Sequence, residues 1–425
     1  MSTNVLGSNY GEKVVKEIAA GFESSAVTVK TVNTTNIQGE HDSSTGDTIY
    51  HKRKTQYRAG ETANGDYSVA GTNNDILVGK IPYTRQNVIT VFHDWNTVEE
   101  ALELNQLPEL LRPVGESIIV KAEQNLNTFI VGAAGLTTGV PGTAVDAWAD
   151  VAASEAILFD IGCPMSGKKY YQMGTGTSTA LAGIQTGLYN DKRVATAWDN
   201  AQVSSPMANM TTIKSNALIN LTNGVCADRA GTLSGNPDVT WATHKDTMIQ
   251  TIPVTGLTTA GVIKKGETIE CVGRYHVNPQ NGNILFDAAG NPITFKWTVT
   301  ADVTLSGGAG NVLVTNAAIF DAASNNQYDN VSSAPVSGDV INILGASAGL
   351  VKPNLFYHEN AVSFASIELP KLDAQDVTYQ TKDGLRFRVS RGSDFAGNRN
   401  QMRVDFVPAF GVDQPLHVGR SYGFA

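Results

Sequence analysis

The longest regular pattern of apolar and polar positions lies between residues 97 and 132. Apolar side chains recur there at every fourth residue and polar side chains fill the opposite face, which predicts a long amphipathic helix. Thr97 and Glu100 have the spacing of a capping box, and Pro113 suits the first turn of a new helix after the interruption at Pro108. The expected apolar stripe is Val114, Ile118, Ala122, Leu126 and Ile130, and the expected solvated face is Glu116, Lys121, Glu123, Gln124 and Asn127.

The segments on either side of this helix have other patterns. Residues 10–22 predict a short amphipathic helix, which needs a partner surface because it is too short to be stable alone. Residues 41–80 are polar and rich in turn formers, which favours a long β-loop that projects from a body. Residues 87–92 form a strand pattern. Residues 146–225 alternate between helical and strand periods, as expected of a mixed α/β domain.

Helical periodicity disappears in residues 226–347, where short strand patterns are separated by turns. VTWATH at 239–244 and NILFD at 283–287 are among the expected strands. GETIECVG at 266–273 and GDVINILG at 338–345 echo each other, each placing an alternating strand between glycines. We expect an inserted β-barrel here, and strands in 348–425 that complete a sheet begun before the insertion. The predicted fold class is α+β.

Composition narrows the class of protein. A chain of 425 residues is expected to hold two or three domains, and its net charge of −9 argues against nonspecific binding of nucleic acid by the whole surface. No apolar run approaches the ~20 residues that span a bilayer, and the N-terminus lacks the features of a signal peptide. Three distant cysteines support neither a disulfide framework nor a zinc site. A reducing compartment fits best.

No stretch of the sequence specifies catalysis. GTGTST at 174–179 resembles a phosphate-binding loop, but it lacks the Gly-Lys-Ser/Thr ending that supplies charge and a magnesium ligand. A structural turn is therefore strongly favoured. The seven histidines are scattered, and none stands in a known catalytic order. We therefore predict that the protein is not an enzyme and has no catalytic residues, bound metal or cofactor.

Several stretches, in this order along the chain, resemble the major capsid (coat) proteins of tailed bacteriophages. The similarity is strongest to coat proteins of short-tailed phages that carry an inserted telokin-like domain. It covers most of the chain outside the insertion, whereas inside it the strand pattern matches more than the residues do. The stretches are EHDSSTGDTIYHKR at 40–53, TVEEALELNQLPELLRPV at 97–114, TGLYNDKRVATAWDNAQV at 186–203, KPNLFYH at 352–358, LPKL at 369–372 and MRVDFVPAF at 402–410.

The resemblance implies the fold that tailed-phage and herpesvirus major capsid proteins share. Its parts would be an N-terminal arm (1–40), an extended β-loop (41–80), a peripheral domain with the spine helix (81–145), the first part of an axial α/β domain (146–225), the inserted β-barrel (226–347) and return strands (348–425).

The resemblance also implies a function. Hexamers and pentamers would form an icosahedral shell, T=7 in the nearest relatives, around packaged double-stranded DNA that is enclosed without sequence-specific binding. Scaffolding protein and a portal protein would be partners, no membrane would be involved, and assembly in the host cytoplasm would yield the virion. A secreted or surface β-rich adhesin or carbohydrate-binding protein is the alternative, but it favours a signal peptide and disulfides. A hydrolase would need a catalytic constellation.

Two groups of residues are candidates for contacts between subunits. The densest basic run lies in the extended loop, where a solvated strand face and an intersubunit ion-pair surface are about equally expected. In a shell, its partners would be acidic side chains of the adjacent subunit's long helix. A polar stretch of the barrel is a candidate for contact with a neighbouring capsomer. The residues are Lys52, Arg53, Lys54 and Arg58 in the loop, Glu99, Glu100, Glu103 and Glu109 in the helix, and His244, Lys245 and Asp246 in the barrel.

Overall fold

The computed structural model describes residues 7–40, 46–53, 57–59, 61–66, 76–98, 107–187, 191–322, 326–372 and 376–422. The chain divides into two compact units. Unit 1 consists of Met1–Tyr50, Pro82–Asn127 and Ser363–Gly411, and unit 2 of His51–Ile81, Thr128–Val362 and Val412–Ala425. Within the described residues, no helix is both long enough and apolar enough to cross a membrane.

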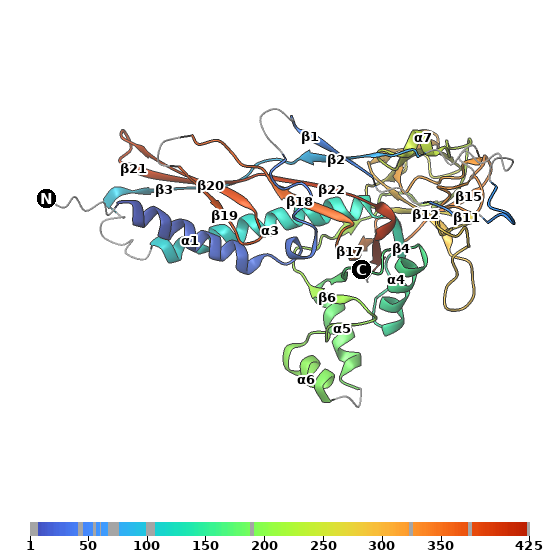
Figure 1. Cartoon of the computed structure of the whole chain (residues 1–425), viewed down its shortest axis with the longest axis horizontal. Coiled ribbons are helices and arrows are strands. Elements are labelled where there is room, and N and C mark those ends of the chain that lie inside the picture. The colour runs from blue at the N-terminus through green and yellow to red at the C-terminus, as the bar shows by residue number, and fades with distance from the viewer. Residues whose placement is uncertain are drawn as a thin grey trace. The chain divides into compact units, whose positions relative to one another are not determined.

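Two helices and most of two sheets build unit 1 (Figure 1). The helices are α1 (Gly7–Ser25) and the part of α3 (Leu107–Ala133) that ends at Asn127, with a short 3-10 turn, η1 (Val29–Thr31), after α1. Their backbones approach closely, because a Cβ on Gly115 would lie 2.1 Å from the carbonyl oxygen of Ile18. Phe22 of α1 packs on Phe387 and Phe406 of the sheet, with ring centroids 5.9 and 5.3 Å away.

The sheet of unit 1 is antiparallel and has the order β19-β20-β21-β3. Its strands are β19 (Val377–Gln380), β20 (Arg386–Asp394), β21 (Arg399–Phe406) and β3 (Ile89–Asn96). A second sheet has the order β1-β2-β22-β18, and most of its residues also belong to unit 1. It consists of β1 (Thr48–Lys52), β2 (Lys80–Arg85), β22 (Pro408–Val412) and β18 (Val362–Ser366).

The long helix differs from its prediction in two respects. Pro113 lies inside α3 and does not begin a new helix, whereas Pro108 occupies the first turn, where a missing amide hydrogen costs little. Glu123 and Asn127, expected on a solvated face, are buried. The apolar stripe from Val114 to Ile130 is buried as predicted, so the period was right but the buried arc is wider than the stripe.

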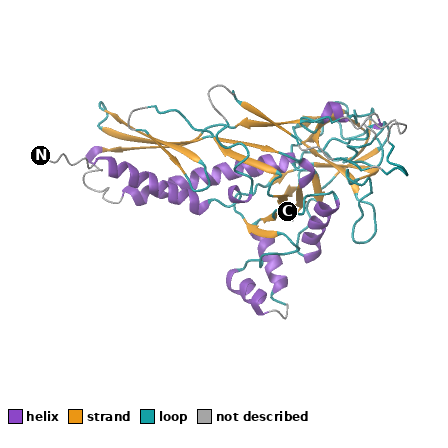
Figure 2. Cartoon of the chain, in the orientation of Figure 1, coloured by secondary structure: helices purple, strands orange, loops and turns teal. Residues whose placement is uncertain are grey.

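The α/β part of unit 2 carries a five-stranded sheet of order β4-β23-β17-β5-β6. The strands are β4 (Leu136–Thr138), β23 (Val418–Tyr422), β17 (Pro353–His358), β5 (Lys169–Met173) and β6 (Thr211–Lys214). Strands from the end of the chain therefore complete a sheet begun before the barrel, as predicted. The other elements, whose helices Figure 2 shows in purple, are α4 (Trp148–Asp160), α5 (Thr175–Gln185), α6 (Asp191–Asn200), η3 (Pro415–His417) and the pair β7 (Leu221–Thr222) with β16 (Leu350–Val351).

Six strands between residues 230 and 343 form a closed barrel, in the order β11-β12-β14-β9-β8-β15. They are β8 (Ala230–Leu233), β9 (Ile249–Thr255), β11 (Thr268–Tyr275), β12 (Thr294–Val299), β14 (Gly310–Thr315) and β15 (Val340–Ile343). Two short strands in the same stretch of sequence, β10 (Val262–Ile263) and β13 (Val303–Thr304), pair with each other. Phe295 and Trp297 fill the barrel core. The prediction of an α+β chain with a β-barrel is confirmed.

The two echoing segments of the barrel are neighbours. β11 and β15 pair antiparallel, with Ile269 opposite Ile343 and Cys271 opposite Ile341. The flanking glycines Gly266, Gly273, Gly338 and Gly345 all have positive φ, between 81° and 92°. An L side chain is strained in that conformation. The glycines therefore mark the turns on both sides of β15, the turn before β11, and the irregularity inside β11 at Gly273.

Two strand predictions in the barrel region were wrong. Residues 241–244 of VTWATH form a short helix, α7 (Trp241–His244), because Trp241 and His244 both turn inward, as neighbours one helical turn apart can. NILFD makes isolated bridges at Ile284 and Phe286 and no strand. Short apolar runs cannot be assigned to helix or strand by periodicity alone.

A buried arginine joins the barrel to the five-stranded sheet. Arg420 of β23 is fully buried, and its guanidinium donates hydrogen bonds to the carbonyl oxygen of Gly266 and to the hydroxyls of Thr268 and Thr298, the last two at 2.7 Å. The ring of Tyr422 lies 5.3 Å from the guanidinium. Burial lowers the pKa of Arg420. Its charge is therefore stabilised by neutral oxygens and an aromatic face.

Candidate functional site

The predicted contact residues do not lie together on one exposed surface. In the basic run, Lys52 is exposed, Arg53 is buried and Arg58 is half-buried. Lys54 lies outside the residues that the structure describes. The same holds for the predicted acidic partners Glu99, Glu100 and Glu103, and for the side chain of Glu109, whose backbone belongs to the first turn of α3. The predicted ion pairs between subunits stay predictions.

Arg53 is a structural residue of its own chain. Its side chain is 3% exposed, and the guanidinium donates to three backbone carbonyl oxygens. Nη1 lies 2.7 Å from the oxygen of Asp413, Nη2 lies 2.8 Å from that of Asp246, and Nε lies 3.0 Å from that of Lys245. The expectation that Arg53 projects from an exposed ribbon is wrong, because carbonyl oxygens within the subunit use the whole fork of donors.

The base of the extended loop is fixed to the barrel region around Arg53, and we call this contact the arm junction (Arg53 and residues 76–80 against Trp241, Lys245, Asp246 and Tyr328). Indole Nε1 of Trp241 donates to the carbonyl of Leu77 at 2.9 Å. The Trp241 ring stacks on Tyr328 with centroids 4.5 Å apart. A Cβ on Gly79 would lie 2.0 Å from the carbonyl oxygen of Lys245, so no larger residue fits there.

His244 contributes to the same region from within. It is buried, and its two ring nitrogens lie 2.8 Å from the carbonyl oxygens of Ile249 and Asp238. The expectation that its side chain forms an exposed contact is therefore wrong. Lys245 and Asp246 are half-buried, with Nζ 3.6 Å from the carboxylate. Asp246 also accepts a hydrogen bond of 2.8 Å from the amide of Lys80. These two residues remain candidates for contact outside the chain.

Arg58 lies against the barrel at the turn formed by Asn281 and Gly282. A Cβ on Gly282 would lie 3.1 Å from Cζ of Arg58. Burial raises the pKa of Asp329, and the positive charge of Arg58 partly opposes that shift. Arg58 therefore has a negative partner within electrostatic range in its own chain, although Asp329 is remote in sequence.

A buried acid, missed by sequence reasoning, fixes the N-terminal segment of unit 1. The Glu123 carboxylate accepts hydrogen bonds from the amides of Val27 at 2.6 Å and Val29 at 3.2 Å, at the start of η1. Burial raises the pKa of Glu123, and the hydrogen bonds from residues 27–29 and the charge of Lys30 oppose this shift. Val27 and Glu123 are 96 residues apart, so no local sequence pattern indicates this contact.

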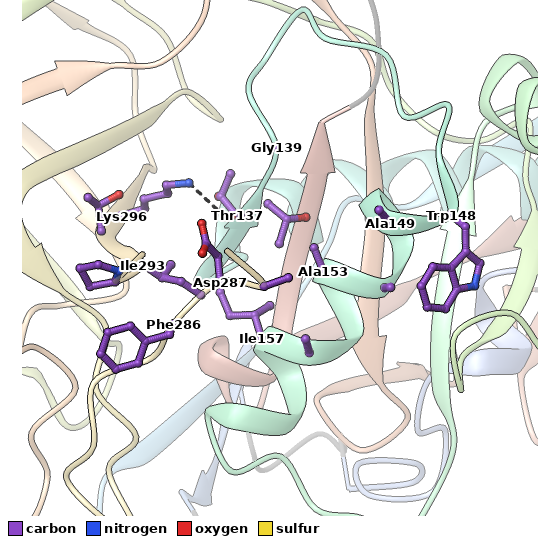
Figure 3. A pocket seen from close by; sticks show the side chains of 16 residues that line it. Thr137, Gly139, Trp148, Ala149, Ala153, Ile157, Phe286, Asp287, Ile293 and Lys296 are labelled. Carbon is purple, nitrogen blue, oxygen red and sulfur yellow. Dashed lines mark hydrogen bonds between the residues drawn. The ribbon is translucent and has the colours of Figure 1, made fainter. Parts of the chain in front are cut away.

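Figure 3 shows a cavity of about 490 Å³ in unit 2, between α4 and the segment 286–296. Alanines of α4 form one wall, and the exposed rings of Trp148 and Phe286 stand at the rim. Nζ of Lys296 points toward Thr137 and donates to its carbonyl oxygen at 3.4 Å (Figure 3). Burial lowers the pKa of Lys296. Lys296 thus serves mainly to join β12 to β4.

The cavity lacks the groups that catalysis requires. Its one acid, Asp287, holds its own turn, because Oδ1 accepts hydrogen bonds from the amides of Ala289 and Asn291. Those bonds lower the pKa of Asp287. In the part of the chain that the structure describes, no cluster of three or more His, Cys, Asp or Glu could hold a metal ion. GTGTST forms the start of α5, where the amide of Gly174 donates to Asn354.

One face of the β19-β20-β21-β3 sheet is open over part of its area, and we call it the open sheet face (Phe92, Asp94, Gly392, Asp394, Arg399, Gln401 and Arg403). Three cross-strand rows define it. Phe92 pairs with Arg403, Asp94 pairs with Gln401, which pairs with Gly392, and Arg399 pairs with Asp394. Arg399 of β21 forms an ion pair across the face with Asp94 of β3 at 2.6 Å, and Arg403 pairs along its own strand with the buried Asp405 at 2.7 Å.

Comparisons with known proteins agree with one another. The family model described as P22 coat protein, gene protein 5, matches residues 1–422. The major capsid protein of Acyrthosiphon pisum secondary endosymbiont phage 1 is 33% identical over 425 residues, covering 99% of this chain and 99% of that protein.

Similar solved structures are those of Mycobacterium phage Che8 and of the capsid of Ralstonia phage GP4. The first has a TM-score of 0.47 and 10% identity, over 93% of this chain and 90% of the other. The second has a TM-score of 0.43 and 9% identity, over 92% and 87%.

Proposed function

This chain belongs to the P22 coat protein family, and from that premise we propose that its copies form an icosahedral shell of hexamers and pentamers around packaged double-stranded DNA. The function of the chain is that of a phage major capsid protein, a structural component of the virion that assembles into multimeric shells. The observation that carries this conclusion is the full-length match to a major capsid protein at 33% identity.

The finer parts of the proposal concern partners and geometry. Assembly would require a scaffolding protein and a portal, would occur in the host cytoplasm and would give T=7 shells. The protein would have no enzymatic activity. The six-part division, with an arm at 1–40 and an inserted barrel at 226–347, belongs to this proposal. Family membership supports it, and a net charge of −9 would keep the shell from adhering to DNA.

Contacts between subunits are proposed for Lys52, which is exposed, for Lys245 and Asp246, which are half-buried, and for Lys54, which lies outside the described residues. Lys52 and Lys54 would meet acidic side chains of an adjacent copy, for which Glu99, Glu100, Glu103 and Glu109 are candidates. Lys245 and Asp246 would face a neighbouring capsomer. Single exposed ion pairs contribute only about 0–1 kcal/mol, so their effect would depend on repetition through the shell.

The alternative of a secreted adhesin is not supported by the comparisons, which lead to phage capsid proteins. A hydrolase that used the cavity beside α4 would need an acid and a base arranged there. The acid in that cavity holds a turn and its lysine bonds a backbone carbonyl, so neither is arranged as a catalytic pair.

Expression with and without the scaffolding protein, followed by sedimentation and negative-stain microscopy, tests the proposal. We expect closed shells of uniform size when the scaffolding protein is present. A monodisperse monomer under both conditions would overturn the proposed assembly.

A further inference from the structure

We propose that the open sheet face packs against a second copy of this chain, with Gly392 at the point of closest backbone approach. This inference rests on the proposed function, because an assembling protein is what presents further copies to the face. It goes further by naming a surface and the residue that makes close approach possible.

Among the described residues, nothing at Gly392 requires a glycine. It lies inside β20, its φ is not in the left-handed region, and a Cβ there would meet nothing within 4 Å. Gly21 differs, because a Cβ there would lie 2.3 Å from the carbonyl oxygen of Arg112. Glycine inside a strand weakens it, and it often marks a place where another backbone approaches closely. No described residue supplies such a backbone at Gly392, and we assign that role to another copy.

Within the described residues, the chain covers this side of the sheet only as far as Ser390. Arg388 donates to the carbonyl oxygen of Pro370, and the hydroxyl of Ser390 donates to Asp376 at 2.8 Å. Ser390 is consequently 8% exposed, whereas Gly392, two residues on and on the same side, is exposed. The internal cover therefore stops at the row that contains the glycine.

Two exposed aromatic side chains lie on the same sheet and turn as Gly392. Phe92 is 54% exposed on this face, and Phe395, in the turn between β20 and β21, is 95% exposed. The turn is held in place, because Arg399 pairs with Asp94 and the hydroxyl of Thr97 lies 2.8 Å from Oδ1 of Asn398. A preorganised apolar surface loses little entropy on association.

Charge favours a second copy as the occupant. Each copy carries a net charge of −9, so two copies repel each other over most of their surfaces. Among the members of the open sheet face, two guanidinium groups offset two carboxylates, and the net charge is +2 − 2 = 0. The groups are Arg399 and Arg403 against Asp94 and Asp394. Two copies can therefore meet here without repulsion.

The first test replaces Gly392 with valine and with alanine. Both side chains suit an extended strand with open space, so the free chain should keep or raise its Tm. We expect Gly392→Val to lower the yield of shells by about tenfold, with Gly392→Ala intermediate. The matched control is Gly183→Ala on α5, where a Cβ likewise meets nothing within 4 Å.

The outcomes separate this inference from the proposed function. If wild-type protein forms shells and Gly392→Val forms them in equal yield, the inference is overturned and the proposed function stands. If wild-type protein forms no shells, the proposed function itself fails. Loss of Tm in free Gly392→Val would show that the side chain is not tolerated within the chain, which contradicts the argument from open space.

Thiol labelling identifies the occupant. The three native cysteines are buried, and burial raises the pKa of Cys163 and Cys271 to about 12, so a thiol in Gly392→Cys is the reactive one. We expect a maleimide to label it at least about tenfold more slowly in shells than in free chains. Equal rates would overturn the proposal. Protection by scaffolding protein alone, before copies associate, would assign the face to that partner and overturn it too.

Discussion

The barrel and the β19-β20-β21-β3 sheet are both antiparallel, but they differ in how much of their surface the chain itself completes. In the barrel each strand has two neighbours, and the inward side chains pack around Trp297. The sheet packs its inner face on Phe22 of α1 and leaves its other face open beyond Ser390. Folding of one chain therefore pairs every barrel strand, whereas the open sheet face keeps exposed surface, which we propose a second copy covers.

Loss of Arg420 should have the largest effect, because it breaks the polar contact between the barrel and the five-stranded sheet. Arg420→Ala leaves a cavity and strips buried oxygens of their donor, so we expect a loss of about 3–5 kcal/mol in the free energy of unfolding. Urea denaturation measures it. Arg420→Lys keeps the charge but loses the fork and should fall between. An unchanged midpoint for the alanine variant would show that the barrel does not depend on this contact.

Loss of Arg53 tests whether the arm junction stabilises the fold of the single chain. Arg53→Ala removes three hydrogen bonds to backbone carbonyl oxygens, and we expect a loss of about 2–4 kcal/mol. Lys52→Ala, at the exposed neighbouring position, is the matched control and should change stability by less than about 0.5 kcal/mol. Equal thermal midpoints for the two variants would contradict the assignment of Arg53 to the interior.

Glu123 gives the corresponding test inside unit 1. Glu123→Ala leaves the amides of Val27 and Val29 without their acceptor, at a cost of about 1–3 kcal/mol. Glu123→Gln keeps an acceptor and carries no charge. Because burial raises the folded pKa above the ordinary 4.5, stability is lost as the pH rises from 4.5 through the folded pKa, and the full penalty of the ionised form applies above it. The glutamine variant should therefore match or exceed wild type near pH 7, and a deficit as large as that of alanine would refute this account.

His276 makes the barrel sensitive to acid. Burial, followed by the nearby charge of Lys296, lowers its pKa to about 3 from the ordinary 6.5. Between those values the unfolded chain binds a proton that the folded barrel does not. The free energy of unfolding therefore decreases as the pH is lowered, by up to roughly 1.4 kcal/mol per pH unit. His276→Gln should flatten this dependence between pH 6 and pH 4, as followed by thermal melts. A slope identical to that of wild type would contradict the prediction.

The smallest effect on the folded chain is expected at two basic residues of the extended loop: Lys52, which is exposed, and Lys54, which lies outside the described residues. Lys52→Glu combined with Lys54→Glu should change the stability of the free chain by about 0–1 kcal/mol, yet lower the yield of shells. High salt should weaken wild-type shells in the same direction, because exposed ion pairs are screened. Particle yield and circular dichroism provide the two readouts. Normal particles at normal yield would show that these lysines are merely solvated.

The periodic pattern of apolar residues predicted several elements of the fold. The stripe from Val114 to Ile130 predicted α3, and the alternation in GETIECVG and GDVINILG predicted two barrel strands that pair directly. These elements bury one regular face, so the pattern of single residues contains the answer. The short helix α7 was missed because four residues do not establish a period.

The candidate site was less accessible to sequence reasoning. A run of basic residues indicates exposure on average, but the partners of Arg53 are carbonyl oxygens at Lys245, Asp246 and Asp413, which no side-chain pattern reveals. His244 and Glu123 were misplaced for the same reason. Gly392 could not be identified from the sequence, because its proposed role depends on the open space beside the strand, which only the structure shows.

The stacking of Trp241 on Tyr328 gives the arm junction an optical property. Trp241 is buried and its indole nitrogen donates to Leu77, so detachment of the loop base would expose the ring to water. Tryptophan emission moves to longer wavelength when the ring is hydrated. The junction thus contains its own spectroscopic reporter, which would respond to movement of the loop during assembly without any added dye.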